Sequence, residues 1–265
     1  MGEALLRFGQ ITAMWVRASR AYPASFWMLM SGSFLITSID FVAVIIMFAN
    51  VDDLGGFSFH EVAFLYGSSG IGIAVADLFV GQVERLGLLI RLGRLDQMMV
   101  RPVPLLVQVC AEEFPMRRIG RLTQAAVVFA WSCAYVDWSP SRVLMAFLMV
   151  VSGCAIFIAL FVGFACIQFW TTESAEVANA FTYGGNTVTA YPLTIFPSEL
   201  VKAMTFVVPI AFVNWYPGLY VLGREEATPL PDWTLWLSPL VGLMLLGLTA
   251  LVWRYGVRQY RSTGS

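Results

Sequence analysis

Apolar residues gather along this chain in long runs rather than in short or alternating patches. A helix needs about 20 residues to cross the roughly 30 Å hydrocarbon core of a membrane. Apolar runs of about that length occupy residues 26–49, 61–82, 118–136, 143–169 and 235–253. We therefore expect an all-α membrane protein in which each of these runs is a transmembrane helix.

The stretch before the last run holds two weaker apolar pieces, 174–194 and 201–222. The second piece carries Pro209 and Pro217, and proline interrupts helical hydrogen bonding. We expect residues 195–222 to form short re-entrant helices that dip into the outer leaflet and return, packed against protein or water. The piece 174–194 then becomes the fifth span, and the predicted total is six.

Residues 1–25 precede the first span and contain an amphipathic pattern. Between residues 3 and 22, apolar side chains fall on one face of a helical projection and arginines fall on the other. This pattern predicts an interfacial helix that lies flat on the membrane surface. A soluble amphipathic helix is the alternative.

Composition agrees with a membrane protein: 58% of the residues are hydrophobic, 12% are charged, and the mean hydropathy is +0.74. Soluble domains are about 45–50% apolar and about 25% charged. This excess of apolar residues excludes a disordered chain, a nucleic-acid binder and a small disulfide scaffold. The net charge of −1 gives no attraction to a polyanion.

The distribution of basic residues predicts the orientation. Of the 16 basic residues, all but Arg142, Lys202 and Arg224 lie before the first span, between the second and third, at the start of the third, or after the last. Positively charged loops favour the cytoplasmic side, so both termini are expected in the cytoplasm. No internal repeat or soluble segment stands out, and residues 1–265 are expected to form a single transmembrane domain.

Motifs for enzymatic chemistry are missing from the sequence. The chain has one histidine, His60, and four cysteines with no C-x-x-C spacing, which gives no pattern for a metal site. Its one lysine, Lys202, is not part of a Gly-Lys-Ser/Thr motif, so there is no P-loop. The chain is not expected to hydrolyse ATP or to be an enzyme.

The longest predicted cytoplasmic connection, residues 83–105, combines a leucine stripe with charged flanks. Leu88, Leu89, Leu92 and Leu95 form the stripe. A short amphipathic helix of this kind could dock in a groove of another protein, or it could bind anionic lipid headgroups. Composition alone leaves both alternatives open.

Two aspartates lie well inside predicted spans, where an unpaired charge is costly. Asp40 lies near the middle of the first span, and Asp77 lies in the inner half of the second. They could face a substrate path or bind protons. Alternatively, each could be satisfied by a polar or basic side chain of a neighbouring helix.

The predicted fifth span carries a polar face, formed by Glu176, Asn179, Tyr183 and Asn186 at helical spacing. Such a face should not point to lipid, because unsatisfied polar groups find no water there. It is expected to line the substrate path or a dimer seam, or to make buried interhelical hydrogen bonds. We expect Glu176 to be structural, and Tyr183 and Asn186 to contact cargo or water.

Several segments resemble a family of bacterial type-2 ABC-exporter membrane subunits. The loop sequence RLGRLDQMMVRPVPLLVQ is similar to that family's I-R-x-G-x-L-D-x-x-L-x-R-P segment. Further similar segments are LGGFSFHEVAFLYG, YPLTIFPSEL, TFVVPIAFVNWYPGLYVLGR and the C-terminal WRYGVRQYRSTGS. Phe57 departs from the family, which often has Trp at that position. The resemblance covers essentially the whole chain.

The resemblance implies a six-span permease subunit with a flat N-terminal helix, a cytoplasmic coupling helix between spans two and three, and re-entrant helices before span six. Its partners would be two copies of a separate ATPase, which bind ATP and magnesium, and a second membrane subunit, identical or paralogous. It implies outward transport across the bacterial inner membrane. The implied coupling residues are Arg91, Arg94, Asp96, Arg101 and Pro102. The alternative is a proton-coupled secondary transporter that uses Asp40 and Asp77.

Overall fold

The computed structural model describes residues 14, 23–113, 115, 117–171 and 175–260. Within these residues the chain is helical, and the only strand-like pairing is a bridge between Leu54 and Phe57. The longer helices are α2 (Pro23–Phe48), α3 (Phe59–Val80), α7 (Arg118–Ser132), α8 (Pro140–Ala165), α9 (Ala175–Thr189) and α12 (Ser238–Gln259). The shorter ones are α4 (Leu86–Arg91), α5 (Arg94–Met99), α6 (Leu105–Cys110), α10 (Ser198–Phe206) and α11 (Trp215–Leu222).

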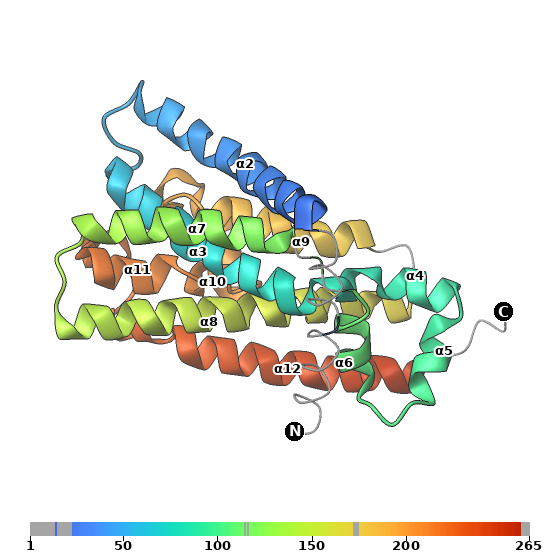
Figure 1. Cartoon of the computed structure of the whole chain (residues 1–265). Coiled ribbons are helices and arrows are strands. Elements are labelled where there is room, and N and C mark those ends of the chain that lie inside the picture. The colour runs from blue at the N-terminus through green and yellow to red at the C-terminus, as the bar shows by residue number, and fades with distance from the viewer. Residues whose placement is uncertain (1–13, 15–22, 114, 116, 172–174, 261–265) are drawn as a thin grey trace.

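The long helices run alternately between two ends of the molecule (Figure 1). Helices α3, α8 and α12 finish at the end where α4, α5 and α6 lie, and α2, α7 and α9 begin there. Arg85, Arg94, Arg118 and Arg258 belong to elements at this end, which we call the arginine-rich end. The links Gly55–Ser58 and Asp137–Ser139 lie at the opposite end.

Local sequence signals account for several helix starts. Before α3, the backbone N–H of Ser58 donates to Glu61 Oε2 at 2.7 Å, so a side chain satisfies a donor that the helix itself cannot. Helix α8 begins with Pro140 after Ser139, whose Oγ accepts from the backbone N–H of Arg142 at 3.4 Å. Proline suits the first helical position because its missing donor would have no partner there.

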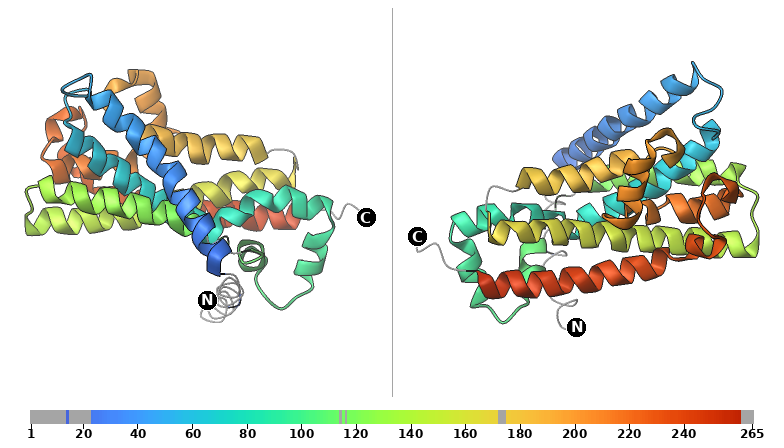
Figure 2. Two further views of the ribbon diagram at one scale, coloured as in Figure 1. Left: turned by 45° about the horizontal axis from the view of Figure 1, so that its top comes forward. Right: turned by 180° about the vertical axis from the view of Figure 1, so that it is seen from behind.

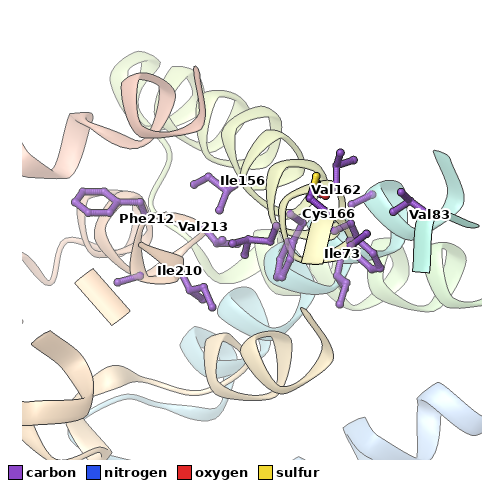
Figure 3. Close-up of a cluster of buried hydrophobic side chains, with 14 of the residues drawn as sticks. Ile73, Val83, Ile156, Val162, Cys166, Ile210, Phe212 and Val213 are labelled. Atoms are coloured by element: carbon purple, nitrogen blue, oxygen red, sulfur yellow. Dashed lines mark hydrogen bonds between the residues drawn. The ribbon is translucent and has the colours of Figure 1, made fainter. Parts of the chain in front are cut away.

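The core is formed where α3 and α8 pack against the turn before α11. Ile73 of α3, Ile156 and Val162 of α8, and Ile210 and Val213 of that turn are buried together (Figure 3). Helix α3 also packs closely on α7: a Cβ at Gly67 would lie 2.7 Å from backbone atoms of Phe129. Glycine at position 67 therefore permits the close α3–α7 contact that places the site described below.

The number of candidate membrane spans is smaller than the six that the sequence predicts. Four helical segments are long and apolar enough to cross a membrane among the residues described: Pro23–Phe48, Phe59–Arg91, Pro140–Phe169 and Ser238–Gln259. Helix α10 and the segment Ile210–Leu222 meet at a bend of 78° and would add a fifth if they formed one broken span. Helices α7 and α9 have 15 residues each, or about 22 Å, which is less than the hydrocarbon thickness.

Helix α2 is the least buried of the six longer helices. It crosses the bundle obliquely (Figure 2) and packs mainly on α7, and its only buried residues are Thr37 and Val44. Large apolar side chains such as Ile36 and Ile39, each 67% exposed, cover its outer face. Most of residues 1–25, over which the sequence predicts an interfacial helix, lie outside the described residues. Helix α2 begins at Pro23, within the last three residues of that range.

Candidate functional site

A cavity of about 220 Å³ lies among α2, α3, α7 and α9. Each of these helices contributes at least two residues, and the lining is rich in polar side chains. The lining residues are Thr37, Asp40, Tyr66, Gly70, Ile73, Arg121, Gln124, Ala125, Tyr183, Asn186, Thr187 and Ala190. The cavity therefore contains Asp40, Tyr183 and Asn186, three residues that the sequence singles out from two different helices.

Hydrogen bonds hold α9 against α3 on the side of the cavity that is farther from the arginine-rich end. Ser69 Oγ donates to Asn186 Oδ1 at 3.3 Å and also contacts the hydroxyl of Thr189. Behind this contact, Asn214 Nδ2 donates to the carbonyl oxygens of Leu65 at 2.8 Å and Thr189 at 2.7 Å. The amide oxygen of Asn186 is thereby used within the protein, while its side chain still lines the cavity.

Asp77 lies next to the cavity, on the side of the arginine-rich end, and is the centre of a buried ionic cluster. Its side chain is nearly inaccessible, with 3% of the residue exposed. Asp77 Oδ1 lies 3.1 Å from Arg118 Nε and accepts from the Tyr183 hydroxyl at 3.3 Å, and Oδ2 lies 3.6 Å from Arg121 Nη1. Arg118 Nη1 also donates to the backbone oxygen of Asp77 at 2.7 Å. The cluster thus joins α3, α7 and α9.

The two arginines have different surroundings. The Arg118 side chain is 13% exposed and holds both the carboxylate and the backbone of Asp77. The Arg121 side chain is 33% exposed, lies 5.4 Å from the ring centroid of Tyr183, and lines the cavity. Glu84 lies within electrostatic range of both arginines, so two acids and two bases are grouped at this level.

Asp40 has no comparable partner. The residue is exposed, it lines the cavity from α2, and no hydrogen bond or ion pair to it is found within the described part of the chain. Tyr66 lies within electrostatic range of both Asp40 and Arg121, and its hydroxyl donates to the backbone oxygen of Thr37 at 3.2 Å. The two aspartates of the sequence analysis therefore occupy very different surroundings.

The remaining polar residues of α9 do not all join this site. Glu176 is exposed near the arginine-rich end, and Asn179 is half-buried with an Oδ1 that has no partner within the described residues. Neither lines the cavity, whereas Thr187 does. The polar face of α9 is thus divided between the cavity and the arginine-rich end.

The loop predicted to dock on a partner forms two short helices, α4 and α5, rather than one. They meet at Gly93, which has φ +64°, a left-handed conformation that glycine adopts without strain. Of the leucine stripe, Leu89 and Leu95 are buried, and Leu92 is 57% exposed. The stripe is therefore split between an inner face that anchors the loop and an outer tip.

Contacts within the protein also engage some of the predicted coupling residues. Arg94 Nη1 lies 2.6 Å from Glu112 Oε1. Burial, with a smaller contribution from the negative charge of Asp96, raises the pKa of Tyr260 at the end of α12 to about 12. Arg91 is exposed on α4, while Arg101 and Pro102 are exposed beyond α5. Asp96 is half-buried and interacts electrostatically with the end of α12, and its role in coupling stays a prediction.

Sequence reasoning missed two features of these sites. The partners of Asp77 were not identified, although Arg118 and Arg121 stand three residues apart at the start of a predicted span, a spacing that places both on one helix face. The exposed apolar tip of the loop was also missed: Met99 is 46% and Val100 is 85% exposed. Two adjacent apolar residues before Arg101-Pro102 were the available signal.

Comparison with known proteins supplies the family. No curated protein and no solved structure matches the chain. A family model described as "ABC-2 family transporter protein" matches residues 34–264, which include the cavity, the ionic cluster and the α4–α5 loop. Because the match covers most of the sequence, the chain belongs to the ABC-2 family of transporter proteins.

Proposed function

We propose that the chain is the permease subunit of an ATP-driven exporter that moves its substrate outward across the bacterial cytoplasmic membrane. In this proposal a separate ATPase, present in two copies, binds ATP and magnesium, and a second membrane subunit, identical or paralogous, completes the assembly. Membership of the ABC-2 family supports an ABC permease. The absence of a P-loop from the sequence supports an energy source on another chain.

The observation that carries the proposal is the α4–α5 loop. Its apolar tip, formed by Leu92, Met99 and Val100, protrudes from the arginine-rich end while Leu95 and Met98 anchor it in the core. Exposed apolar side chains ringed by charge are typical of a protein-binding surface. Arg91 and Arg101 flank the tip and suit acidic groups at the rim of a groove. We therefore assign the tip to ATPase docking.

The proposed topology has six spans with both termini in the cytoplasm. The alternating direction of α2, α3, α7, α8, α9 and α12 supports it (Figure 1), as does the positive charge at one end. In this layout α7 and α9 are short spans, and α10 with α11 is a re-entrant pair in the outer leaflet. The 78° bend near Pro209 supports a return rather than a straight crossing.

In this proposal, the cavity among α2, α3, α7 and α9 forms part of the substrate path. Tyr183, Asn186 and Asp40 line it, and Asn179 and Asp77 belong to the helices that form its base. The exposed apolar face of α2 supports a second membrane subunit that covers the open side. The contacts of Asp77 with two arginines and a tyrosine argue against its use as a proton carrier, and so against the proton-coupled alternative.

The test is reconstitution with the partner ATPase. The tagged chain, purified from its native membrane, should retain a protein that hydrolyses ATP, and the complex in liposomes should show ATP-dependent, vanadate-sensitive transport. The matched pair is Val100→Asp against Val100→Ala: only the charged variant should release the ATPase. A chain that transports without any ATPase, or a Val100→Asp complex that remains intact and active, would refute the proposal.

A further inference from the structure

The cavity has charges of opposite sign on different helices. Asp40 lines it from α2 and Arg121 lines it from α7, and no ion pair joins the two within the described residues. Tyr66 lies within electrostatic range of both side chains. An acid and a base that share a cavity without neutralising each other form a site with two poles.

Arg121 is available at the positive pole. Its contact with Asp77 is long, at 3.6 Å, and Asp77 is also held by Arg118 at 3.1 Å and by the Tyr183 hydroxyl. Arg121 can therefore turn toward a ligand without leaving the Asp77 carboxylate unpaired. The ring of Tyr183 supports the guanidinium from one side, with 5.4 Å between Cζ and the ring centroid.

Asp40 is available at the negative pole. A carboxylate in the middle of a long apolar helix is costly if it faces lipid. Among the described residues no hydrogen bond or ion pair satisfies it. Its position on the cavity wall gives it water or a cationic group as a partner. The exposed apolar face of α2, which includes Ile36 and Ile39, would meet the hydrocarbon chain of any amphiphile that reaches the cavity from the lipid.

Resting on the proposed function, we infer that the cavity binds a zwitterionic group, with its anionic part at Arg121 and its cationic part at Asp40. Asn186 of α9 also lines the cavity, and its side-chain NH2 group can donate hydrogen bonds to the bound group while its amide oxygen accepts from Ser69. The volume of about 220 Å³ is below the roughly 300–1,000 Å³ usual for drug-sized ligands. The site therefore takes a compact headgroup, either from a lipid-like amphiphile or from a small soluble zwitterion.

The experiment measures ATPase stimulation of the complete complex in nanodiscs by amphiphiles that share one acyl chain length. The probes are lysophosphatidylethanolamine (zwitterionic), lysophosphatidylglycerol (anionic) and an alkyltrimethylammonium salt (cationic). Glycerophosphoethanolamine is a fourth probe, with the zwitterion but no acyl chain. Each response is divided by the same variant's own basal rate, so that changes in basal activity cancel.

Opposite changes in charge preference are expected from two variants. Arg121→Gln should weaken stimulation by the zwitterionic probe about tenfold, or about 1.4 kcal/mol, and shift the preference to the cationic probe, because the charge-assisted hydrogen bond to the anionic part is lost. Asp40→Asn should shift the preference to the anionic probe. Arg121→Lys and Asp40→Glu, which keep the charges, should retain the zwitterion preference and serve as folding controls.

Two distant neutralisations are matched controls: Arg258→Gln near the end of α12 and Asp52→Asn after α2, both of exposed residues. They should leave the preference unchanged. Stimulation by glycerophosphoethanolamine would identify a soluble zwitterion as the source, and a requirement for the acyl chain would identify an amphiphile. Equal responses of the wild type to all charges, or equal losses for all probes in both variants, would overturn the inference.

The two proposals fail in different ways. If no ATPase co-purifies with the chain, the proposed function fails and the charge preference is then measured as probe binding to the chain alone. If the ATPase is bound and active but neither variant changes the preference, only the zwitterion site is refuted.

Discussion

Removal of the Asp77 carboxylate should be among the most destabilising isosteric changes in the membrane domain. Asp77 is 3% exposed and lies between two arginines and the Tyr183 hydroxyl. In Asp77→Asn the arginines remain, and Arg118, with a side chain 13% exposed, becomes a buried cation without its counter-ion. Breaking one side of a buried pair costs about 3–5 kcal/mol.

The neighbouring substitution Tyr183→Phe provides the scale for comparison. It removes one hydrogen bond of 3.3 Å from the same carboxylate and leaves all charges in place. Interhelical hydrogen bonds in membranes average about 0.6 kcal/mol. At about 2–4 °C per kcal/mol for a chain of this size, Asp77→Asn should lower the unfolding midpoint by about 10 °C, and Tyr183→Phe by about 2 °C.

Thiol reactivity provides the assay, since Cys110 and Cys166 are buried and become reactive on unfolding. The purified chain is heated with a dye that fluoresces on binding thiols. The double variant Asp77→Asn/Arg118→Gln completes a mutant cycle: it should be no less stable than Asp77→Asn alone, because the unpaired cation is also removed. Additive losses, or equal midpoints for Asp77→Asn and Tyr183→Phe, would refute the ion-pair assignment. A proton carrier would predict near-normal stability for Asp77→Asn, which resembles the protonated acid.

Three further expectations follow from the loop and the topology. Gly93→Ala forces φ +64° on a residue with a Cβ and should lower stability by about 1 kcal/mol, measured as a shift of the unfolding midpoint; an unchanged midpoint would contradict the left-handed turn. Val100→Asp should reduce recovery of the ATPase at least tenfold in a pull-down, while Val100→Ala retains it; equal recovery would exclude the tip as the docking surface. Single cysteines at Asp53 and Asp137 should react with an impermeant thiol reagent from outside and one at Arg258 should not; the reverse pattern would invert the proposed orientation.

Much of the fold could be predicted from hydrophobic pattern alone. Helices α2 (Pro23–Phe48) and α3 (Phe59–Val80) agree with the predicted runs 26–49 and 61–82 to within three residues at each end. Helix α8 (Pro140–Ala165) begins three residues before the predicted run 143–169. Long apolar runs report burial away from water whatever the partners are, so they need no tertiary information. The break between α10 and α11 could also be predicted from a local signal, since Pro209 lies within it.

The site could be predicted only in part, because its contacts join residues far apart in the chain. Arg118 contacts Asp77 across 41 residues, and Tyr183 contacts it across 106. The periodicity of hydrophobic residues assigns each residue to one face of its helix, but it does not determine which faces of different helices pack together. The sequence alone therefore could not determine whether Asp77 is paired, because its partners come from α7 and α9, which pack beside α3 only in the folded protein.

The contrast between Asp77 and Asp40 explains how one bundle combines a fixed base with a polar cavity. Asp77 holds α3, α7 and α9 together through charges that have already found partners. Asp40 lies on α2, the least buried of the six longer helices, and its side chain has no hydrogen-bond or ion-pair partner within the described residues. Because α2 packs mainly on α7, a change of its position would alter the cavity wall at Asp40 and leave the Asp77 cluster intact. Any movement that opens the proposed substrate path is therefore expected to shift α2 against a fixed α3–α7–α9 base.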